Sequence, residues 1–150
     1  MKILRVYVDA SVIGGCFDSE FDAESRALVK MAEDGKTILV VSDLLVGELQ
    51  GAPEAVRSFF TSLPPSIIEP LGLSEEADRL HMAYMDAGIV GRGSEDDAQH
   101  VANATVAKVD VLVSWNMRHI VHLDKIRMYN AVNLAKGYSL LSIYTPREVI

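Results

Sequence analysis

Four short runs of β-branched and aliphatic residues restrict the fold of this sequence more than any other feature. They cover Ile3–Val8, Thr37–Val41, Val111–Trp115 and Leu140–Tyr144, and they are nearly continuous rather than alternating with polar residues. Strands buried on both faces have this pattern, whereas strands with one exposed face alternate. The runs therefore predict a parallel sheet that is covered by helices on both sides.

Segments with helical spacing separate these runs, and most have a residue typical of a helix boundary at one or both ends. Serine or proline precedes several of them, and glycine or proline follows. The expected helices are Asp22–Asp34, Ser42–Gln50, Glu54–Leu63, Ser74–Ala87, Ser94–Lys108 and Lys125–Lys136. Alternation of strands and helices implies right-handed crossovers, so the predicted class is α/β with a mainly parallel sheet.

The stretch from Ser42 to Lys108 departs from this alternation. It contains three or four helices and at most one short strand, at Ile67–Glu69. We interpret it as a helical excursion whose hairpin forms one wall of the functional site. A chain of 150 residues with 49% hydrophobic content can bury about two-thirds of its unfolded surface, so we expect residues 1–150 to form a single domain.

Charge and cysteine content narrow the classes of function. A formal net charge of −7 argues against a broad basic face for duplex DNA, because phosphate neutralisation needs clustered Lys and Arg. Cys16 is the only cysteine, which excludes an internal disulfide. No run approaches the roughly 18 apolar residues of a membrane span, and Met1–Val8 is unlike a signal peptide. We therefore expect a soluble, cytoplasmic protein without a membrane partner.

Asp9 stands where the first apolar run stops, at the expected carboxyl end of a strand. In parallel α/β proteins, ligands bind outside the carboxyl ends of the strands. Ser11 follows two residues later, and its hydroxyl is placed to bond the Asp9 carboxylate or to begin a helix. The alternative, with about equal weight, is that Asp9 only caps that helix.

Glu48 lies on the expected helix Ser42–Gln50, beside an apolar stripe formed by Leu44, Leu45 and Leu49. A carboxylate beside such a stripe tends to face a cleft. The alternative is a solvated position paired with a neighbouring cation, but no Lys or Arg lies three or four residues away. Glu48 is therefore a second candidate acid.

Three consecutive acids, Glu95, Asp96 and Asp97, open the helix expected after Ser94. Ser94 and Asp97 have the spacing of a capping box, a structural explanation for one of the acids. Asp97 precedes Ala98 and lies one turn before Val101, so it is the acid best placed to turn inward. Asp96 is the reserve candidate.

Asn116 follows the third apolar run, at another expected strand end. Its amide oxygen is a neutral donor that can bind a metal directly or through water. Mg²⁺ and Mn²⁺ prefer oxygen ligands and often retain water molecules. Asp9, Glu48 and Asp97, with Ser11 and Asn116 around them, therefore predict a site for Mg²⁺ or Mn²⁺.

These segments resemble the PIN-domain family, the metal-dependent nuclease fold that includes VapC-type toxins. Tyr7–Val12 is similar to its opening Asp-x-Ser/Thr element, and Ser42–Glu48 is similar to its second-acid helix. Asp97–Ala102 resembles the Asp-Ala-x-His-Ile/Leu-Ala segment of the third acid. Val113–Asn116 resembles a strand end where many members have Thr-x-Asp, and Tyr144–Glu148 resembles a common ending. The resemblance covers nearly the whole chain.

The resemblance implies a three-layer α/β/α, Rossmann-like sheet and a ribonuclease that hydrolyses RNA phosphodiester bonds. Asp9, Glu48 and Asp97 would bind the metal, Asn116 would complete the catalytic set, and Ser11 and Ser114 would support it. In a VapC-like toxin it further implies a small antitoxin and a homodimer. Asn116 is the main departure, because it removes a negative charge from the site.

Four other polar residues have simpler explanations. Arg92 and Arg118 flank the expected site and are placed to meet an RNA backbone, although ordinary surface charge is favoured as their explanation by about two to one. His100, one turn after Asp97, is expected to be a packed or hydrogen-bonded helix residue rather than a catalytic base. His119 is assigned a surface or helix-entry position.

Two alternatives of another class remain. A chain with this fold that has lost turnover would be a module that binds RNA or a protein partner, and Asn116 favours this alternative. A phosphatase that forms an aspartyl-phosphate would also use a strand-end aspartate. That chemistry usually has a second acid two residues after the nucleophile, where this chain has Ser11.

Overall fold

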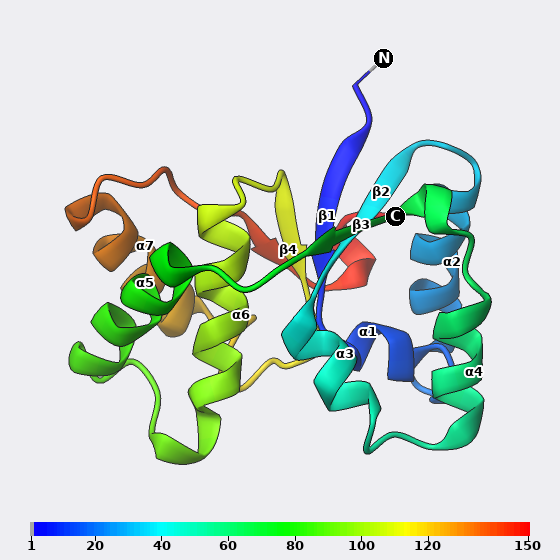
Figure 1. The fold of residues 1–150 in the computed structure, drawn as a ribbon, viewed down its shortest axis with the longest axis horizontal. Helices are drawn as coiled ribbons and strands as arrows, with labels where there is room; N and C mark the ends of the chain where they lie inside the picture. Colours follow the sequence, from blue (N-terminus) through cyan, green and yellow to red (C-terminus); the bar gives the residue numbers. More distant parts are fainter. Residues whose placement is uncertain (1) are drawn as a thin grey trace.

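In the computed structural model, which describes residues 2–150, helices cover both faces of a five-stranded sheet (Figure 1). The strands are β1 Leu4–Val8, β2 Thr37–Ser42, β3 Ile68–Leu71, β4 Val111–Val113 and β5 Ile143–Tyr144. The helices are α1 Ala10–Gly15, α2 Asp22–Glu33, α3 Asp43–Leu49, α4 Glu54–Ser62, α5 Glu75–Asp86, α6 Glu95–Val106 and α7 Leu123–Ala135. Short 3₁₀ helices cover Pro65–Ile67, Arg92–Ser94 and Pro146–Glu148.

The strand order is β3-β2-β1-β4-β5, and every neighbouring pair is parallel. This confirms the predicted α/β class and the parallel sheet. The chain leaves β1 for β2 on one side and later returns to β4 on the other, so the topology reverses at β1. Ligands bind outside the carboxyl ends of strands at such a switch point, and the residue that follows β1 is Asp9.

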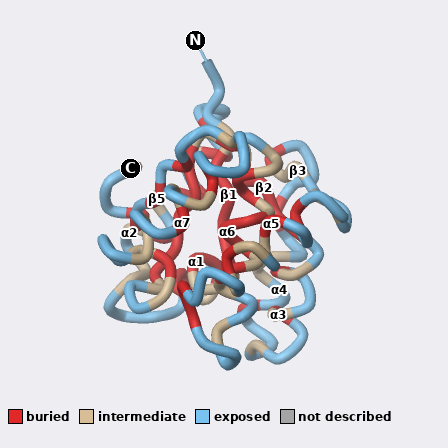
Figure 2. Tube along the Cα trace, turned by 90° about the vertical axis from the view of Figure 1, so that its left-hand side faces the viewer, coloured by how far each residue is buried: buried red, intermediate tan, exposed pale blue. Residues whose placement is uncertain are grey.

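Successive residues of the central strands face two separate hydrophobic cores. Val6 and Val8 of β1 pack with α1, α2, α3 and α4, whereas Tyr7 between them packs with α5, α6 and α7. In β4, Leu112 shares the second core. Figure 2 shows the buried segments concentrated along the sheet and the inner sides of the helices. Burial on both faces accounts for the continuous apolar runs in the sequence.

The helical excursion is present, and it also supplies an edge strand. β3, at Ile68–Leu71, pairs with β2 close to the short strand expected at Ile67–Glu69. α5 and α6 pack against each other on one face of the sheet (Figure 1). Within residues 2–150, no helix combines the length and apolar character that crossing a membrane requires.

The last strand is shorter than predicted. The sequence favoured a strand at Leu140–Tyr144, but β5 contains only Ile143 and Tyr144. The side chain of Asn130, on α7, accepts a hydrogen bond from the Leu141 backbone N–H at 2.8 Å and donates to the Leu141 carbonyl at 3.1 Å. A side-chain amide thus takes the place of a neighbouring strand at this residue, so the ladder begins later.

Trp115 lies just beyond β4 and packs against α2 and the residue that precedes it. Its indole N–H donates to Ser25 Oγ at 2.8 Å, and its ring stacks on Phe21 with centroids 4.2 Å apart. A Cβ on Gly15, the last residue of α1, would lie 2.6 Å from Ser25 Oγ and 2.9 Å from Trp115 Nε1. The close approach of α1 to Trp115 therefore requires glycine at this position.

We expect Gly15→Ala to lower the free energy of unfolding by about 1–3 kcal/mol, because the added methyl group overpacks this contact. Gly14→Ala is the matched control, since no atom lies within 4 Å of its added Cβ. Alanine is the better helix former, so the control should be neutral or more stable by up to about 1 kcal/mol. Urea unfolding measures both. Equal stabilities of the two variants would contradict the packing at Gly15.

Candidate metal centre

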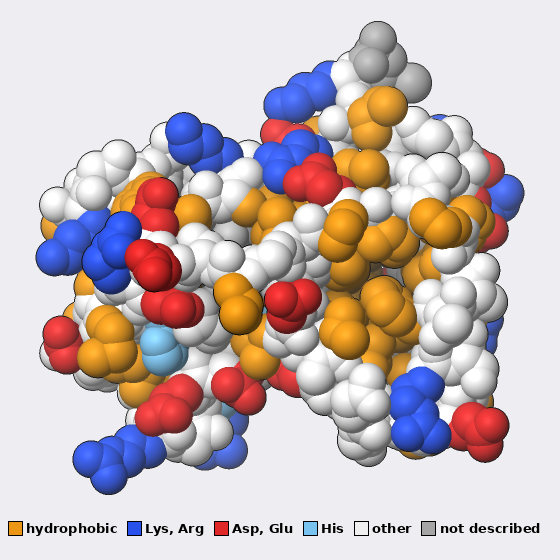
Figure 3. Space-filling view, in the orientation of Figure 1, with side chains coloured by type: hydrophobic (Ala, Val, Ile, Leu, Met, Phe, Trp, Pro, Cys, Tyr) orange, Lys and Arg blue, Asp and Glu red, His pale blue; other side chains and the backbone are white. Residues whose placement is uncertain are grey.

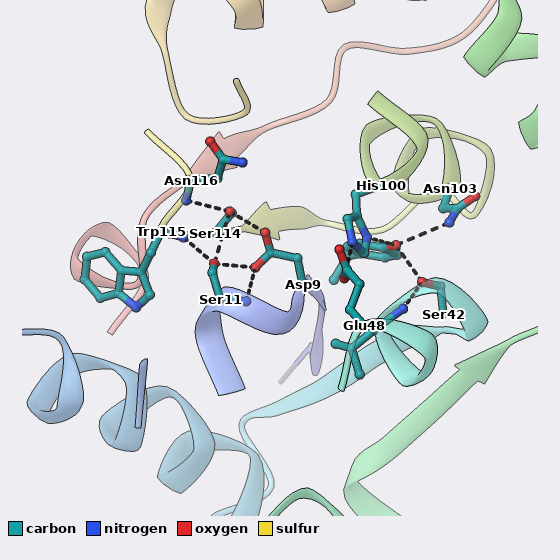
Figure 4. Close-up of polar contacts among 11 residues, drawn as sticks. Asp9, Ser11, Ser42, Glu48, His100, Asn103, Ser114, Trp115 and Asn116 are labelled. Atoms are coloured by element: carbon teal, nitrogen blue, oxygen red, sulfur yellow. Dashed lines mark hydrogen bonds and ion pairs between the residues drawn. The ribbon is translucent and has the colours of Figure 1, made fainter. Parts of the chain in front are cut away.

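The candidate residues meet at the carboxyl edge of the sheet, although four different elements supply them. Asp9 follows β1 directly and Ser114 follows β4 directly, while Glu48 lies on α3, the helix after β2. Asp97 is in the first turn of α6. Figure 4 shows Asp9 between the serines on one side and Glu48 with its partner on the other.

Asp9 is held on both carboxylate oxygens by serine hydroxyls. Ser11 Oγ donates to Oδ1 at 2.5 Å, and Ser114 Oγ donates to Oδ2 at 2.6 Å. The Ser11 backbone N–H also donates to Oδ1 at 3.1 Å, so Asp9 does cap α1. Capping was the alternative weighed for this residue, but it leaves the second oxygen unexplained. Asp9 is 5% exposed, and its orientation is fixed from two sides.

The two serines are themselves held by the chain that leaves β4. The Trp115 backbone N–H donates to Ser11 Oγ at 2.9 Å, and that of Asn116 donates to Ser114 Oγ at 2.9 Å. Each hydroxyl therefore accepts from one backbone amide and donates to Asp9. The start of α1 and the end of β4 are joined through a single carboxylate.

Glu48 contacts a histidine that lies 52 positions further along the chain. Its Oε1 lies 2.7 Å from His100 Nε2, and the Glu48 side chain is 29% exposed while that of His100 is 1% exposed. Leu45 and Leu49 are buried on the same helix. Glu48 thus lies at the edge of the apolar stripe, with one carboxylate oxygen directed at the buried His100 while the side chain remains partly exposed.

Asp97 is the half-buried member of the three consecutive acids, whereas Glu95 and Asp96 are exposed. Burial raises its pKa above the ordinary value, and hydrogen bonding to Asn116 and the nearby histidines offset this only in part. The capping role considered for Ser94 is absent, because its side chain makes no capping hydrogen bond. The 3₁₀ helix Arg92–Ser94 leads directly into α6 and gives Ser94 a non-capping backbone conformation.

Asn116 is oriented as a hydrogen-bond donor to the site. Its amide oxygen accepts from the backbone N–H of His119 at 2.9 Å and of Arg118 at 3.3 Å. The sequence allowed this oxygen to bind a metal directly or through water; in the structure it closes the turn after β4. The side chain of Asn116 lowers the pKa of Asp97 by hydrogen bonding, so it favours the ionised form of that carboxyl group.

Two histidines lie closer to the acids than the sequence indicated. Burial lowers the pKa of His100, but the Glu48 contact and the charges of Asp9 and Asp97 outweigh it and raise the pKa overall. His119, for which the sequence predicted a surface or helix-entry position, is near enough to Asp97 to lower the pKa of that carboxyl group. The available signals were spacings of three residues, from Asp97 to His100 and from Asn116 to His119.

The side chains fit a hard divalent cation in donor type and charge. Throughout residues 2–150, no Lys or Arg forms an ion pair with Asp9, Glu48 or Asp97, and the one basic side chain paired with any of them is His100, which contacts Glu48. In the same residues, no three Asp, Glu, His or Cys side chains are gathered closely enough to hold an ion. Metal binding would therefore require the carboxylates to converge.

An open groove of about 510 Å³ reaches this edge from the side of Glu48. It lies between α3, the Gly72–Ser74 segment and the start of α6. Acidic side chains predominate among its charged residues, and Figure 3 shows acids around the middle of this face. Its lining includes Glu48 and Asp96 but neither Asp9 nor Asp97. The groove is therefore an approach to the site rather than its centre.

Arg92 and Arg118, the predicted RNA contacts, are both exposed. Neither forms an ion pair in the described part of the chain. Their positions, in the turn before α6 and in the turn after Asn116, place one near each of two site elements. They are available to an anionic ligand, and their contact with RNA stays a prediction.

Comparison of sequences finds no family model that matches the chain and no curated protein with significant similarity. Comparison of structures does find similar folds. VapBC2 from Rickettsia felis, bound to a DNA fragment from its promoter, matches with a TM-score of 0.59 at 14% identity over 95% of this chain and 98% of that chain. FitAcB from Neisseria gonorrhoeae matches with a TM-score of 0.59 at 12% identity and the same coverage.

A third match is VapC20 from Mycobacterium tuberculosis, described as a Sarcin-Ricin loop cleaving toxin. Its TM-score is 0.51 at 11% identity, over 91% of this chain and 98% of that chain. Identities this low concern the fold, and the three structures agree with the parallel sheet and helical layers described above. This chain therefore has the PIN fold of the VapC and FitB toxin structures.

Proposed function

We propose that this protein is a ribonuclease that needs Mg²⁺ or Mn²⁺ and uses Asp9, Glu48 and Asp97 to hold the cation. The observation that carries the proposal is the placement of three carboxylates around one sheet edge, none of them with a Lys or Arg ion-pair partner in residues 2–150. Carboxylates that are removed from water need a counter-charge. The PIN fold, which a Sarcin-Ricin loop cleaving toxin shares, supports RNA as the substrate.

A bound divalent cation would supply an activated water molecule and would stabilise the charge that develops on the scissile phosphate. The residues of this chain prepare that chemistry. Ser11 and Ser114 orient the Asp9 carboxylate, while Asn116 favours the ionised form of Asp97. The exposed Arg92 and Arg118 would hold the RNA backbone close to a site that is otherwise negative.

The second candidate is a module that binds RNA or a protein partner without turnover. The orientation of Asn116 favours it, because the amide oxygen is used by backbone N–H groups rather than presented to a metal. The nuclease remains the better-supported proposal, since binding alone does not require three acids without Lys or Arg partners. The two differ in one observable, which is cleavage by metal-loaded protein.

A small antitoxin is the proposed protein partner, and a homodimer is the proposed assembly. Two structural neighbours carry the paired names VapBC2 and FitAcB, and this supports a paired toxin for the present chain. The proposal extends the toxin–antitoxin arrangement to this protein, with the acidic centre as the source of toxicity.

We expect the purified protein to cleave a labelled RNA pool in Mg²⁺ or Mn²⁺ and to lose all cleavage in EDTA. Asp9→Asn and Asp97→Asn should each lower the rate by at least about 100-fold, because lost ligands cost more than lost outer-shell contacts. Asp96→Asn is the matched control and should retain the wild-type rate, since Asp96 is exposed. Gel electrophoresis of the products measures the rates.

Cleavage in EDTA, or full activity of both ligand variants, would contradict the nuclease. Wild-type protein that binds Mn²⁺ and RNA but leaves every RNA intact would instead support the binding module. The Asp96→Asn control separates loss of a specific acid from a general change in the charge of this surface.

Metal-free Asp97→Asn should be more stable than wild type at pH 7. A carboxyl group whose pKa is raised in the folded state is harder to ionise there than in the unfolded chain. Ionised Asp97 therefore opposes folding at neutral pH, and this cost disappears as the pH falls through the folded pKa toward the ordinary value of 3.8. Thermal unfolding in EDTA at pH 7 and at acid pH measures the difference.

The stability gain of Asp97→Asn should be largest at pH 7 and should shrink at acid pH, while Asp96→Asn should show no gain. Mg²⁺ should raise the melting temperature of wild type more than that of Asp97→Asn, because a ligand stabilises the state that binds it. A fall in metal-free stability for Asp97→Asn would argue against an uncompensated acid at this position.

Induced expression of the wild-type chain should arrest growth of a bacterial host, and co-expression of the small protein encoded beside it should restore growth. Asp9→Asn should not arrest growth, although it keeps the same surface for a partner. Growth curves of the paired strains measure both effects. Equal arrest by wild type and Asp9→Asn would show that the toxicity does not depend on the acidic centre.

A further inference from the structure

A buried chain of hydrogen bonds runs from the sheet to Glu48. The Tyr7 hydroxyl on β1 donates to Ser42 Oγ at 2.9 Å and lies 2.6 Å from His100 Nδ1. His100 Nε2 lies 2.7 Å from Glu48 Oε1, and Asn103 Nδ2 donates to the Tyr7 hydroxyl at 3.4 Å. Figure 4 shows Ser42, His100 and Asn103 grouped beside Glu48, with His100 in contact with it. This series of hydrogen bonds thus connects residues of β1, α3 and α6.

The imidazole of His100 is fixed in orientation. It is 1% exposed, both of its ring nitrogens have a partner, and the Tyr7 ring packs edge-on with centroids 5.6 Å apart at 69°. Turning the ring would break two buried hydrogen bonds and leave buried polar groups without partners, which is unfavourable because those groups cannot bond to water instead. The position of Nε2 is therefore set by the core and not by solvent.

These hydrogen bonds constrain both the backbone and the carboxylate of Glu48. Ser42 Oγ accepts from the Leu45 backbone N–H at 3.3 Å and so caps α3, the seven-residue helix that includes Glu48. His100 holds Oε1 of the same side chain. Without that contact, a long glutamate side chain would sample several rotamers. Within residues 2–150, Oε2 forms no hydrogen bond, so one oxygen is held and the other is free to bind a ligand.

We propose that His100 is a positioning residue that holds Glu48 Oε1 so that Oε2 is presented to a cation shared with Asp9 and Asp97. This inference rests on the proposed metal site. Outer-shell hydrogen bonds to ligating groups typically contribute about 10- to 100-fold to metal affinity. His100 does not touch the cation or the substrate, and it acts through Glu48. The Tyr7 hydroxyl extends the same constraint by fixing the histidine ring.

Two substitutions of His100 separate its two contacts. A glutamine amide nitrogen can occupy the position of Nε2, and an asparagine amide nitrogen can occupy that of Nδ1. His100→Gln thus keeps a donor for Glu48, and His100→Asn keeps one for Tyr7. Both variants lose one buried contact, so they form a matched pair for stability. Electron paramagnetic resonance of free Mn²⁺ at fixed pH measures binding, and thermal unfolding in EDTA measures stability.

We expect His100→Asn to weaken Mn²⁺ binding by about 10-fold or more, while His100→Gln stays within about 3-fold of wild type on the same scale. Tyr7→Phe removes only the hydroxyl group and should weaken binding by less than His100→Asn. The RNA cleavage rate at saturating Mn²⁺ should follow the same order. Rescue by glutamine is the result that a purely structural role would not produce.

Equal Mn²⁺ affinity of the two His100 variants, whether wild-type or reduced, would overturn the positioning role. If Asp9→Asn still abolishes Mn²⁺ binding in that case, the proposed metal site stands without it. Wild-type protein that binds no Mn²⁺ would overturn the metal site and the positioning role together.

A metal-free measurement tests the contact itself. In ¹⁵N-histidine-labelled protein in EDTA, the Nε2 resonance of His100 should shift in Glu48→Gln, and it should remain unchanged in the control Asp43→Asn, which alters an exposed acid of the same helix. An unchanged resonance in Glu48→Gln would overturn the proposed positioning role of His100, whatever the metal experiments give.

Discussion

The hydrogen bonds between Asp9 and the two serines determine how the edge of the sheet is built. Ser11 and Ser114 are 103 positions apart, yet both donate to the same carboxylate, and each accepts from the backbone that follows β4. The central strand, the first helix and β4 therefore share one polar junction. Because the Gly15 contact with Trp115 packs directly beside this junction, the hydrophobic layer and the polar site constrain each other.

The negative charge at this edge of the sheet opposes folding and would attract a cationic ligand. Burial makes Asp97 harder to ionise, and the charge of Asp9 adds to the same effect. His100 partly offsets the effect of burial on Asp97. Its ring is buried, however, and both ring nitrogens already have partners, Tyr7 and Glu48. A protein keeps groups of this kind where they serve a function, because stability alone would favour neutral side chains. The cost in stability is itself an argument for a cationic ligand.

Local sequence patterns were enough to predict the sheet and the position of the acids at its edge. The apolar runs gave the strands because burial on both faces leaves a direct trace in composition, and Asp9 was found because it ends such a run. The contact of Glu48 with His100 leaves no such trace, since it joins residues 52 positions apart through tertiary packing. Periodicity also could not predict that the Asn130 side chain replaces a backbone partner beside β5. Nor could it predict that Ser94 makes no capping hydrogen bond.

Asn116 shows how one neutral residue changes the balance of the site. A fourth carboxylate at this position would add repulsion beside Asp97, whose ionisation burial already opposes. The amide instead donates toward Asp97 and accepts from the turn that contains His119. Three carboxylates with one divalent cation would leave a single net negative charge, less repulsive to a phosphate than four carboxylates would be. The neutral side chain is thus compatible with one bound cation, whereas a second cation would have one fewer anionic ligand.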